Sequence, residues 1–323
     1  MLDRSPPSPS ENERERRLAR VADPLPGLKP HPASRPLRVP GALDARPLLE
    51  LLCALHPHHD ERTWREAINT GRLSLRGEVL RDVERQLRAG DELLHEIPDV
   101  VEPWVDARVT VLHEDTALLV LDKPAPLPVH PCGRYRLHTV TELTAAAWPE
   151  LRLRPVHRLD AATSGVLVLA KTRAAARALA RSFERREVEK RYLALVEGHP
   201  RDDHFSVERP IRRQTATAGS RELAGADDMS GGAARSEVHV LDRLADGRAL
   251  VEIVPHEGRT NQIRLHLASS GHPIVDDAVY ASANTQRLET GEALTTGAIC
   301  LNAFRLALDH PESGDPSATP GCL

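Results

Sequence analysis

The segment that decides the fold is His157-Arg158-Leu159-Asp160-Ala161-Ala162-Thr163-Ser164-Gly165, followed at once by Val166-Leu167-Val168-Leu169. The apolar run predicts a buried strand, and the Thr-Ser-Gly sequence predicts a turn before it. The charges of Arg158 and Asp160 are therefore expected at the rim of a sheet. A carboxylate there is either paired structurally or kept for chemistry. From these residues alone, a structural ion pair is the favoured interpretation.

The rest of the chain predicts more strands than helices. Further apolar runs of strand length occur at 118–121, 193–196 and 249–254. Helices are predicted at 173–186 and at 261–270, where Gly271 provides a stop. Because the helices do not alternate strictly with the strands, we predict an α+β domain around a mixed, largely antiparallel sheet rather than a doubly wound fold.

The N-terminal part of the chain has a different character. Residues 1–35 are rich in Pro, Ser, Glu and Arg without an apolar period, which predicts a disordered tail. Residues 36–98 predict a small domain with helices near 48–55 and 61–69, a short strand at 72–76 and a last strand. Its three neighbouring histidines, His56, His58 and His59, indicate an exposed loop rather than a metal site, because no second ligand cluster accompanies them.

A linker then leads into a larger domain, predicted over residues 105–312, with a flexible tail at 313–323. Within it, residues 214–234 are rich in Ala, Gly, Ser and Asp and predict a flexible surface insertion.

Composition excludes several classes of protein. No run approaches the ~20 apolar residues of a membrane span, and the N-terminus lacks the apolar core of a signal peptide. The four cysteines are far apart in sequence, which gives no disulfide framework and indicates a reducing cytoplasm. The net charge of −4 argues mildly against nucleic acid as a partner. Local basic patches matter more, because phosphate attraction acts over about 8–10 Å.

Six further blocks of sequence accompany the opening segment in a fixed order. They are Leu121-Asp122-Lys123-Pro124, Pro128-Val129-His130-Pro131, Lys190-Arg191-Tyr192, Gly258-Arg259-Thr260-Asn261-Gln262-Ile263-Arg264, Gly271-His272-Pro273-Ile274 and Leu301-Asn302-Ala303. Together they resemble the RluA-type RNA pseudouridine synthases over about residues 105–312. The stretch from Pro128 to Tyr135 is similar to the branch that includes eukaryotic tRNA-modifying members. The small domain resembles the alpha-L RNA-binding domain.

The resemblance implies the pseudouridine synthase fold and an isomerase that converts uridine to pseudouridine in structured RNA, either tRNA or rRNA. It implies Asp160 as the catalytic nucleophile, Tyr192 as the buried active-site tyrosine, and Arg264 as the partner of the aspartate. Arg158 is the side chain expected to enter the RNA stack when the target base flips out. The other residues implied in substrate binding are His157, Thr163, Ser164, Gly165, Arg259, Asn261, Ile263 and Leu265.

The chemistry fits these residue types. A carboxylate attacks the ribose or the uracil, a nearby arginine favours its charged form, and a positioned tyrosine can move a proton. Because the isomerisation involves no net redox step or hydrolysis, we expect no metal and no organic cofactor. We also expect a monomer.

Departures from the family pattern are Asn261 in place of His, Glu257 in place of Thr, Ala161 in place of a longer polar residue, and Asp276 in place of Gly. They concern RNA contacts more than the reaction. Two rivals stay open: an RNA-binding protein that keeps the fold without turnover, and a carboxylate-nucleophile hydrolase such as a glycosidase. The hydrolase needs a second carboxylate, and the opening segment supplies none.

Overall fold

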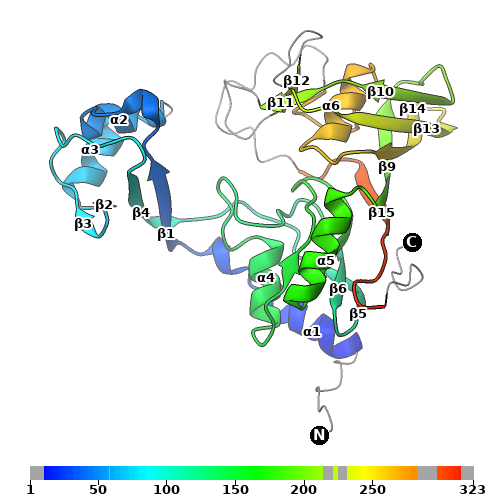
Figure 1. Cartoon of the computed structure of the whole chain (residues 1–323), viewed down its shortest axis with the longest axis horizontal. Coiled ribbons are helices and arrows are strands. Elements are labelled where there is room, and N and C mark those ends of the chain that lie inside the picture. Colours follow the sequence, from blue (N-terminus) through cyan, green and yellow to red (C-terminus); the bar gives the residue numbers. More distant parts are fainter. Residues whose placement is uncertain (1–10, 58, 214–220, 225–230, 282–296, 314–323) are drawn as a thin grey trace, which may run out of the picture. The chain divides into compact units, whose positions relative to one another are not determined.

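The structure, a computed structural model, describes residues 11–57, 59–213, 221–224, 231–281 and 297–313. They belong to two compact units (Figure 1). The smaller unit is Gly27–Glu102, and the larger combines the chain before Gly27 with the chain from Pro103 onward. Residues 1–10 and 314–323, which fall in the predicted tails, lie outside the described residues.

The smaller unit is a four-stranded antiparallel sheet with two helices packed on it. Its strands follow the order β1-β4-β2-β3. The elements are β1 (His31–Arg38), α2 (Leu48–Leu55), α3 (Glu61–Asn69), β2 (Leu73–Leu75), β3 (Glu78–Val79) and β4 (Glu92–Val100), with short 3-10 turns at Pro26–Leu28 and Gly41–Leu43. Leu48, Leu52 and Ile68 from the helices meet Leu93 from the sheet in one apolar core. The two helices and the strand after them confirm the pattern expected for this region.

The prediction of disorder over residues 1–35 is wrong for the described residues from 11 onward. Helix α1 (Glu11–Ala22) forms there, and β1 pairs with β4 from His31. Leu18 and Leu25 are buried in the core of the larger unit, together with Leu143 and Trp148. The segment has too few apolar residues to show the period of an amphipathic helix. The helix is ordered because Leu18 and Leu25 pack against residues far away in the sequence.

The larger unit is built on one nine-stranded mixed sheet with the order β10-β13-β14-β9-β15-β8-β6-β5, and β7 pairs with β8 off this path. Only β15 and β8 are parallel among the strand pairs of this sheet in the described residues. The strands are β5 (Thr110–Glu114), β6 (Leu118–Lys123), β7 (Arg154–Pro155), β8 (Ser164–Ala170), β9 (Glu189–Glu197), β10 (His204–Glu208), β13 (Arg235–Arg243), β14 (Arg248–Pro255) and β15 (Leu301–Ala307). The predicted α+β class and mixed, largely antiparallel sheet are confirmed.

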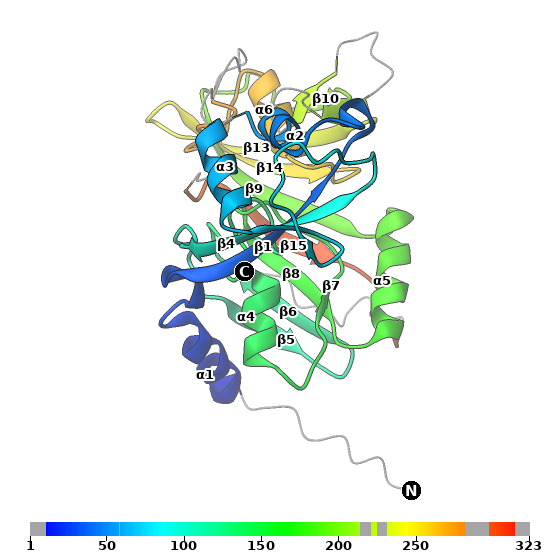
Figure 2. The same ribbon diagram turned by 90° about the vertical axis from the view of Figure 1, so that its left-hand side faces the viewer.

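Helices cover this sheet differently at its two ends (Figure 2). At the β6–β8 end, α5 (Arg173–Glu184) packs on one face through Ala175 and Leu179. On the other face α4 (Val140–Ala147) and α1 pack against residues such as Leu119 and Leu167. At the β13–β14 end, α6 (Gln262–Ser269) contacts β10, β13 and β14 and covers one face. None of the helices in the described ranges is long and apolar enough to span a bilayer.

Part of the predicted flexible insertion at 214–234 is ordered. Strand β12 (Arg221–Leu223) pairs with β11 (Ile211–Arg213) as a two-stranded antiparallel sheet. Residues 231–234 are also described, and Gly232 forms an isolated bridge with Ile211. Residues 214–220 and 225–230 lie outside the described part of the chain.

Candidate active site

The loop between β7 and β8 carries Asp160 to the middle of the large sheet. The Thr163 N–H donates to the Asp160 carbonyl oxygen at 3.1 Å and closes a turn. Gly165 follows at the start of β8 with a φ of +115°, a conformation that favours glycine. A Cβ there would lie 2.4 Å from the carbonyl oxygen of Ala303. Glycine is therefore needed for the parallel pairing of β8 with β15, which fixes this end of the loop.

A buried lysine fixes the loop from the neighbouring strand. Lys123, the last residue of β6, is fully buried. Its Nζ donates to the carbonyl oxygens of Leu127 at 2.8 Å, Pro124 at 2.9 Å and Ala161 at 3.4 Å. Burial lowers the pKa of Lys123 to about 7, and the negative charge of Asp160 partly opposes this shift. The lysine therefore joins the segment from Pro124 to Leu127 to the loop at Ala161, next to the aspartate.

Asp160 itself is half-buried in the wall of a cavity of about 250 Å³. Burial raises the pKa of its carboxyl, and the positive charges of Arg264, Arg158 and Lys123 oppose this shift. Among the described residues, no side chain or backbone group donates a hydrogen bond to the carboxylate. Its oxygens are therefore held in a positive environment and left available to a reacting atom.

Tyr192 lies in the wall of the same cavity. The residue directly opposite Tyr192, on β14, is the buried Ile253, which packs in the apolar cluster under α6. Because directly opposed residues share a face, Tyr192 lies on the face of the sheet that α6 covers. Burial, with a further contribution from the negative charge of Asp160, raises the pKa of Tyr192. The phenol therefore keeps its proton at neutral pH, and it offers the cavity a flat ring and a hydroxyl donor.

Arg264, in α6, is held by a different carboxylate from the one expected. Its Nε and Nη2 each donate to Asp277 at 2.7 Å, and both side chains are buried. No ion pair joins Arg264 to Asp160 within 4.0 Å among the described residues, so the expected pairing of Arg264 with the aspartate is not formed as an ion pair in the structure. The physical reason is geometric: Asp277 fits the Nε–Nη2 edge of the planar guanidinium. Arg264 acts on Asp160 through its charge, which is the largest of the influences that lower the pKa of Asp160.

Two further side chains support the guanidinium. Asn261 has a left-handed backbone with φ of 58°, which asparagine tolerates better than most residues. Its Oδ1 accepts from Arg264 Nη1 at 3.3 Å, and its Nδ2 donates to the Tyr280 hydroxyl at 2.9 Å. The ring of Tyr280 lies 4.8 Å from the guanidinium carbon. The departure at position 261 thus takes part in positioning the arginine.

Comparisons with known proteins identify the family of this chain. The model of the family described as RNA pseudouridylate synthase matches residues 117–269. The Escherichia coli K12 protein named dual-specificity RNA pseudouridine synthase RluA is 34% identical over 214 residues, which cover 66% of this chain and 91% of that protein. The chain belongs to the RluA-type RNA pseudouridine synthase family.

Other members of this family match more of the chain or share its fold. The Saccharomyces cerevisiae protein named tRNA pseudouridine(32) synthase, mitochondrial, is 30% identical over 237 residues, or 73% of this chain. The chain spans 50% of the length of that yeast relative. The solved structure of human RNA pseudouridylate synthase domain containing 1 has 26% sequence identity and a TM-score of 0.53, over 66% of this chain and 83% of the human one.

Nine of the twelve residues predicted for a pseudouridine synthase site line the cavity. They are His157, Arg158, Asp160, Thr163, Tyr192, Arg259, Asn261, Ile263 and Arg264. Ser164, Gly165 and Leu265 do not. Ser164 accepts a hydrogen bond from Asn302 at 2.9 Å, and Leu265 is buried in a separate apolar cluster. Ser164, Gly165 and Leu265 therefore contribute to the packing around the cavity and not to its wall.

His157 lines the cavity, but one of its ring nitrogens already has a partner. Its Nε2 accepts the Val168 N–H at 3.1 Å, and its ring stacks on Phe183 with centroids 5.1 Å apart. Burial lowers the pKa of His157 to about 4, so the ring is neutral at physiological pH. The Nε2 acceptor role places the proton on Nδ1. His157 therefore anchors the loop to β8, and only Nδ1 remains for a ligand.

The sequence did not identify all residues that shape this synthase site. Lys123 was visible within the Asp-Lys-Pro block, and Asp277 was visible beside Asp276, but no function was assigned to either. Lys190, which shares the cavity wall, is half-buried, and burial lowers its pKa. A buried charge is recognised only from its packing, because its partners come from distant parts of the chain.

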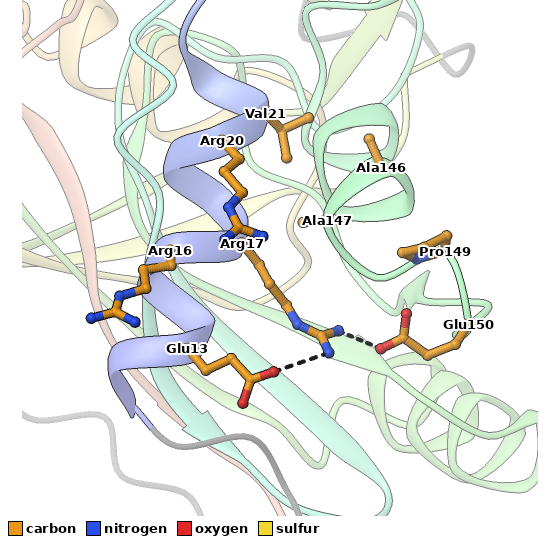
Figure 3. Close-up of a pocket in the computed structure, with 9 residues that line it drawn as sticks. All are labelled: Glu13, Arg16, Arg17, Arg20, Val21, Ala146, Ala147, Pro149 and Glu150. Carbon is orange, nitrogen blue, oxygen red and sulfur yellow. Dashed lines mark hydrogen bonds and ion pairs between the residues drawn. The ribbon is translucent and has the colours of Figure 1, made fainter.

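A second hollow lies between α1 and α4 (Figure 3). Arg17 points across it and pairs with Glu150, and also with Glu13 at 3.5 Å. Arg16 and Arg20 lie on the same helix. This hollow lacks any of the twelve predicted site residues, so the synthase chemistry is assigned to the cavity around Asp160.

Proposed function

We propose that the chain is an enzyme that isomerises uridine to pseudouridine in RNA, with Asp160 as its nucleophile. The observation that carries this proposal is the meeting of Asp160, Tyr192 and Arg264 in one cavity. Family membership supports the reaction type, and the geometry supports the roles of the side chains.

The reaction rearranges one nucleoside. The Asp160 carboxylate attacks either C1′ of the ribose or C6 of the uracil, and the bond between C1′ and N1 breaks. The uracil turns in the cavity, a bond forms between C1′ and C5, and the aspartate is released. The C5 proton is lost to a base and N1 ends protonated, so no electrons are gained or lost overall. The rearrangement therefore needs neither an oxidant nor a reductant.

The surroundings of Asp160 suit this attack. Burial raises its pKa, which makes the carboxylate a better nucleophile once it is ionised. The charges of Arg264, Arg158 and Lys123 favour the ionised form. Tyr192, as a neutral phenol, is suited to stack on the uracil and to donate a hydrogen bond. Its raised pKa makes a resting phenolate costly, so removal of the C5 proton by Tyr192 requires a proton acceptor for the phenol.

The substrate proposed is a structured tRNA or rRNA whose target base flips into the cavity. The name of the yeast relative supports tRNA. Arg158 is exposed at the cavity, as expected of a side chain that fills the gap in the RNA stack. Exposed arginines on and just after α5 provide a track for the RNA backbone, and they are Arg173, Arg177, Arg181, Arg185 and Arg186.

The smaller unit is proposed as an alpha-L-like RNA-binding domain, supported by its order of two helices and short strands. A cytoplasmic monomer is also part of the proposal. The free thiols of Cys53, Cys132 and Cys300 support a reducing compartment.

The rival functions are less well supported. A hydrolase needs a second carboxylate as its acid or base, and Glu257 also lines the cavity. However, Glu257 Oε2 accepts the Arg235 N–H at 2.7 Å, and Asp277 is engaged by Arg264. An RNA-binding protein without turnover has no need of an aspartate that is half-buried among cations.

A tritium-release assay tests the proposal, because isomerisation frees the hydrogen at C5. Transcripts of tRNA and rRNA stem-loops labelled with 5-tritiated uridine are the substrates. We expect the wild-type chain to release tritium and Asp160→Asn to lose at least about 1,000-fold in rate, with RNA affinity kept within a few-fold. Asp246→Asn, at an exposed turn, is the matched control.

Two outcomes contradict the proposal in different ways. Substantial turnover by Asp160→Asn would remove the nucleophile assignment. Tight RNA binding by the wild type without tritium release from any RNA, including total cellular RNA, would favour the binding protein.

A further inference from the structure

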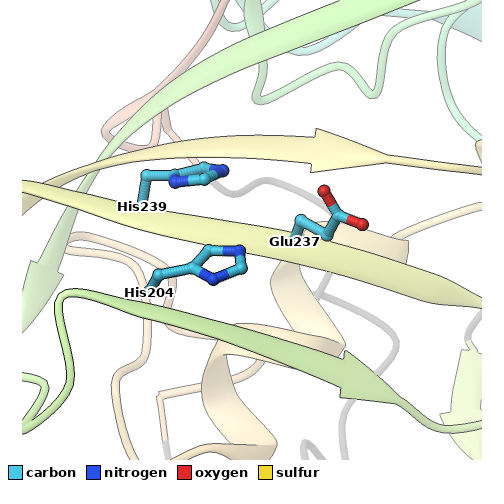
Figure 4. Close-up of side chains that lie close together, drawn as sticks. All are labelled: His204, Glu237 and His239. Carbon is cyan, nitrogen blue, oxygen red and sulfur yellow. The ribbon is translucent and has the colours of Figure 1, made fainter.

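Two histidines and a glutamate lie together on the outer face of the large sheet (Figure 4). His204 of β10 lies directly opposite His239 of β13. Glu237 is two residues before His239 on the same strand, so both side chains point to the same side of the sheet. One strand pair therefore presents three metal-binding side chains to one point.

This face is the one that α6 does not cover. Val238, which lies between Glu237 and His239 on β13, is buried in the apolar core beneath α6. Val238 lies opposite Ile253, and Ile253 lies opposite Tyr192. Because directly opposed residues share a face, Tyr192 and the catalytic cavity belong to the α6 side. The His-Glu cluster is on the other side of the sheet, so it is independent of the proposed isomerase site.

The distances suit a single ion. One ligand atom from each of the three residues lies within 4.8 Å of the other two. The imidazole rings of His204 and His239 have centroids 4.4 Å apart. In a tetrahedral zinc site with Zn–N bonds of about 2.0–2.1 Å, ligand nitrogens are about 3.3 Å apart. The His204 side chain is exposed, so its ring is free to rotate towards the other two ligand atoms.

The carboxylate of Glu237 is already oriented by its neighbours. Its Oε1 accepts from Arg235 Nη2 and from His256 Nε2, each at 3.0 Å. No hydrogen bond to Oε2 is present among the described residues. Arg235 also pairs with Glu208 at 3.2 Å, which balances part of its positive charge. Partners that hold one carboxylate oxygen and leave the other for the ion are typical of metal sites.

We propose that His204, Glu237 and His239 bind one divalent transition-metal ion of the zinc class, which ties the edge strand β10 to β13. Two imidazoles and one carboxylate are ligands that zinc accepts, and three protein ligands leave a fourth position for water. Among the described strands β10 lies at one edge of this sheet and pairs only with β13, so the ion adds a second link to that strand. The ion takes no part in the isomerisation.

The test uses the full chain without an affinity tag, stripped of metal with a chelator. Calorimetric titration with Zn²⁺ is expected to give one site per chain for the wild type and for His199→Gln, an exposed histidine outside the cluster. His239→Gln and Glu237→Gln are expected to weaken binding at least tenfold. Circular dichroism checks that each variant is folded, and Co²⁺ absorption reports the ligand geometry.

Hydrogen exchange gives a second readout that is specific to the role of the ion. With Zn²⁺ present, the amides of 204–208 are expected to exchange at least several-fold more slowly in the wild type, and at an unchanged rate in His239→Gln. Absence of Zn²⁺ and Co²⁺ binding below millimolar concentration would overturn the proposal. So would binding that His239→Gln and Glu237→Gln both retain, since that would place the ion elsewhere on the surface.

Discussion

Asp277 holds Arg264 by two parallel hydrogen bonds, from Nε to Oδ2 and from Nη2 to Oδ1, each 2.7 Å long. The pair is buried, and Asn261 accepts from the remaining Nη1. The guanidinium is thus fixed close enough for its charge to act on Asp160, but not in contact with it. This arrangement favours an ionised nucleophile without occupying the oxygens that must react.

The substitution Asp277→Asn is expected to slow turnover although Asp277 does not line the cavity. An amide accepts only one of the two donors, so Arg264 is left partly unpaired and can turn towards Asp160 and block it. We expect kcat to fall by about 10–100-fold, which is the effect of removing residues that orient the ligands at metal sites. We expect the free energy of unfolding to fall by about 3 kcal/mol, because a buried charge loses its partner. Tritium release and urea unfolding measure the two effects.

The control for this prediction is Asp276→Asn at the neighbouring exposed position. Asp276 has φ of 66°, which asparagine tolerates, so neither turnover nor stability should change appreciably. Folded Asp277→Asn with an unchanged kcat would show that the orientation of Arg264 is unimportant.

Lys123→Met is expected to lower stability by an amount that depends on pH. Three carbonyl oxygens lose their buried donor, which costs about 3 kcal/mol or more. The pKa of Lys123 is lowered to about 7 in the folded chain, from the ordinary value of 10.5 in the unfolded chain. Between these values the unfolded chain binds more protons, so the stability of the wild type increases as the pH rises through this window. Methionine does not titrate.

Melting temperatures at pH 6.5 and pH 9 measure this effect. The gap between the wild type and Lys123→Met should widen at the higher pH. Lys29→Met, at an exposed position, should leave the melting temperature unchanged at both. A gap that narrows at pH 9 would mean that burial does not depress the pKa of Lys123.

Residues close together in sequence made much of this site predictable. The segment from His157 to Gly165 showed a charged loop before a buried strand, and the family blocks added Tyr192 and Arg264. Which carboxylate binds Arg264 was not predictable, because it depends on where the chain from Ile274 to Tyr280 is placed. An isolated bridge between Val196 and Ile274 sets that placement, and a bridge of this kind has no sequence signature.

The same reason explains why helix α1 was not predicted from the sequence. In α1 and the residues after it, Leu18 and Leu25 are buried while the charged residues between them stay near the surface. Such a segment looks disordered by composition. It is ordered because α4 and the sheet provide an apolar surface for those few side chains.

Gly165→Ala is expected to unfold or strongly destabilise the larger unit. The added Cβ would lie 2.4 Å from the Ala303 carbonyl oxygen, and backbone atoms cannot move aside cheaply. We expect a loss of more than about 3 kcal/mol in the free energy of unfolding, with turnover lost as the Asp160 loop shifts.

Gly247→Ala is the matched control for this substitution. Its φ of +89° is similarly unfavourable for alanine, but a Cβ there meets no atom within 4 Å. It should cost only about 1 kcal/mol. If the two alanine variants were equally stable, the approach of β8 to β15 would not explain the glycine.

The smaller unit can be removed without removing α1, because its two ends meet. The Glu102 N–H donates to the Gly27 carbonyl oxygen at 2.9 Å, so a short Gly-Ser linker can replace residues 27–102. Leu18 and Leu25 then keep their places in the core of the larger unit. Deletion of residues 1–102 removes them and exposes the apolar surface that they cover, so that variant is expected to be less stable.

The linker variant is expected to keep its rate on a short stem-loop within a few-fold of the wild type. If the smaller unit binds RNA, the variant should bind long RNA more weakly, and its affinity should fall less steeply with salt because fewer phosphates are contacted. Filter binding at a series of salt concentrations measures both quantities. An unchanged affinity and an unchanged salt slope would assign all of the RNA binding to the larger unit, because the linker variant retains that unit intact.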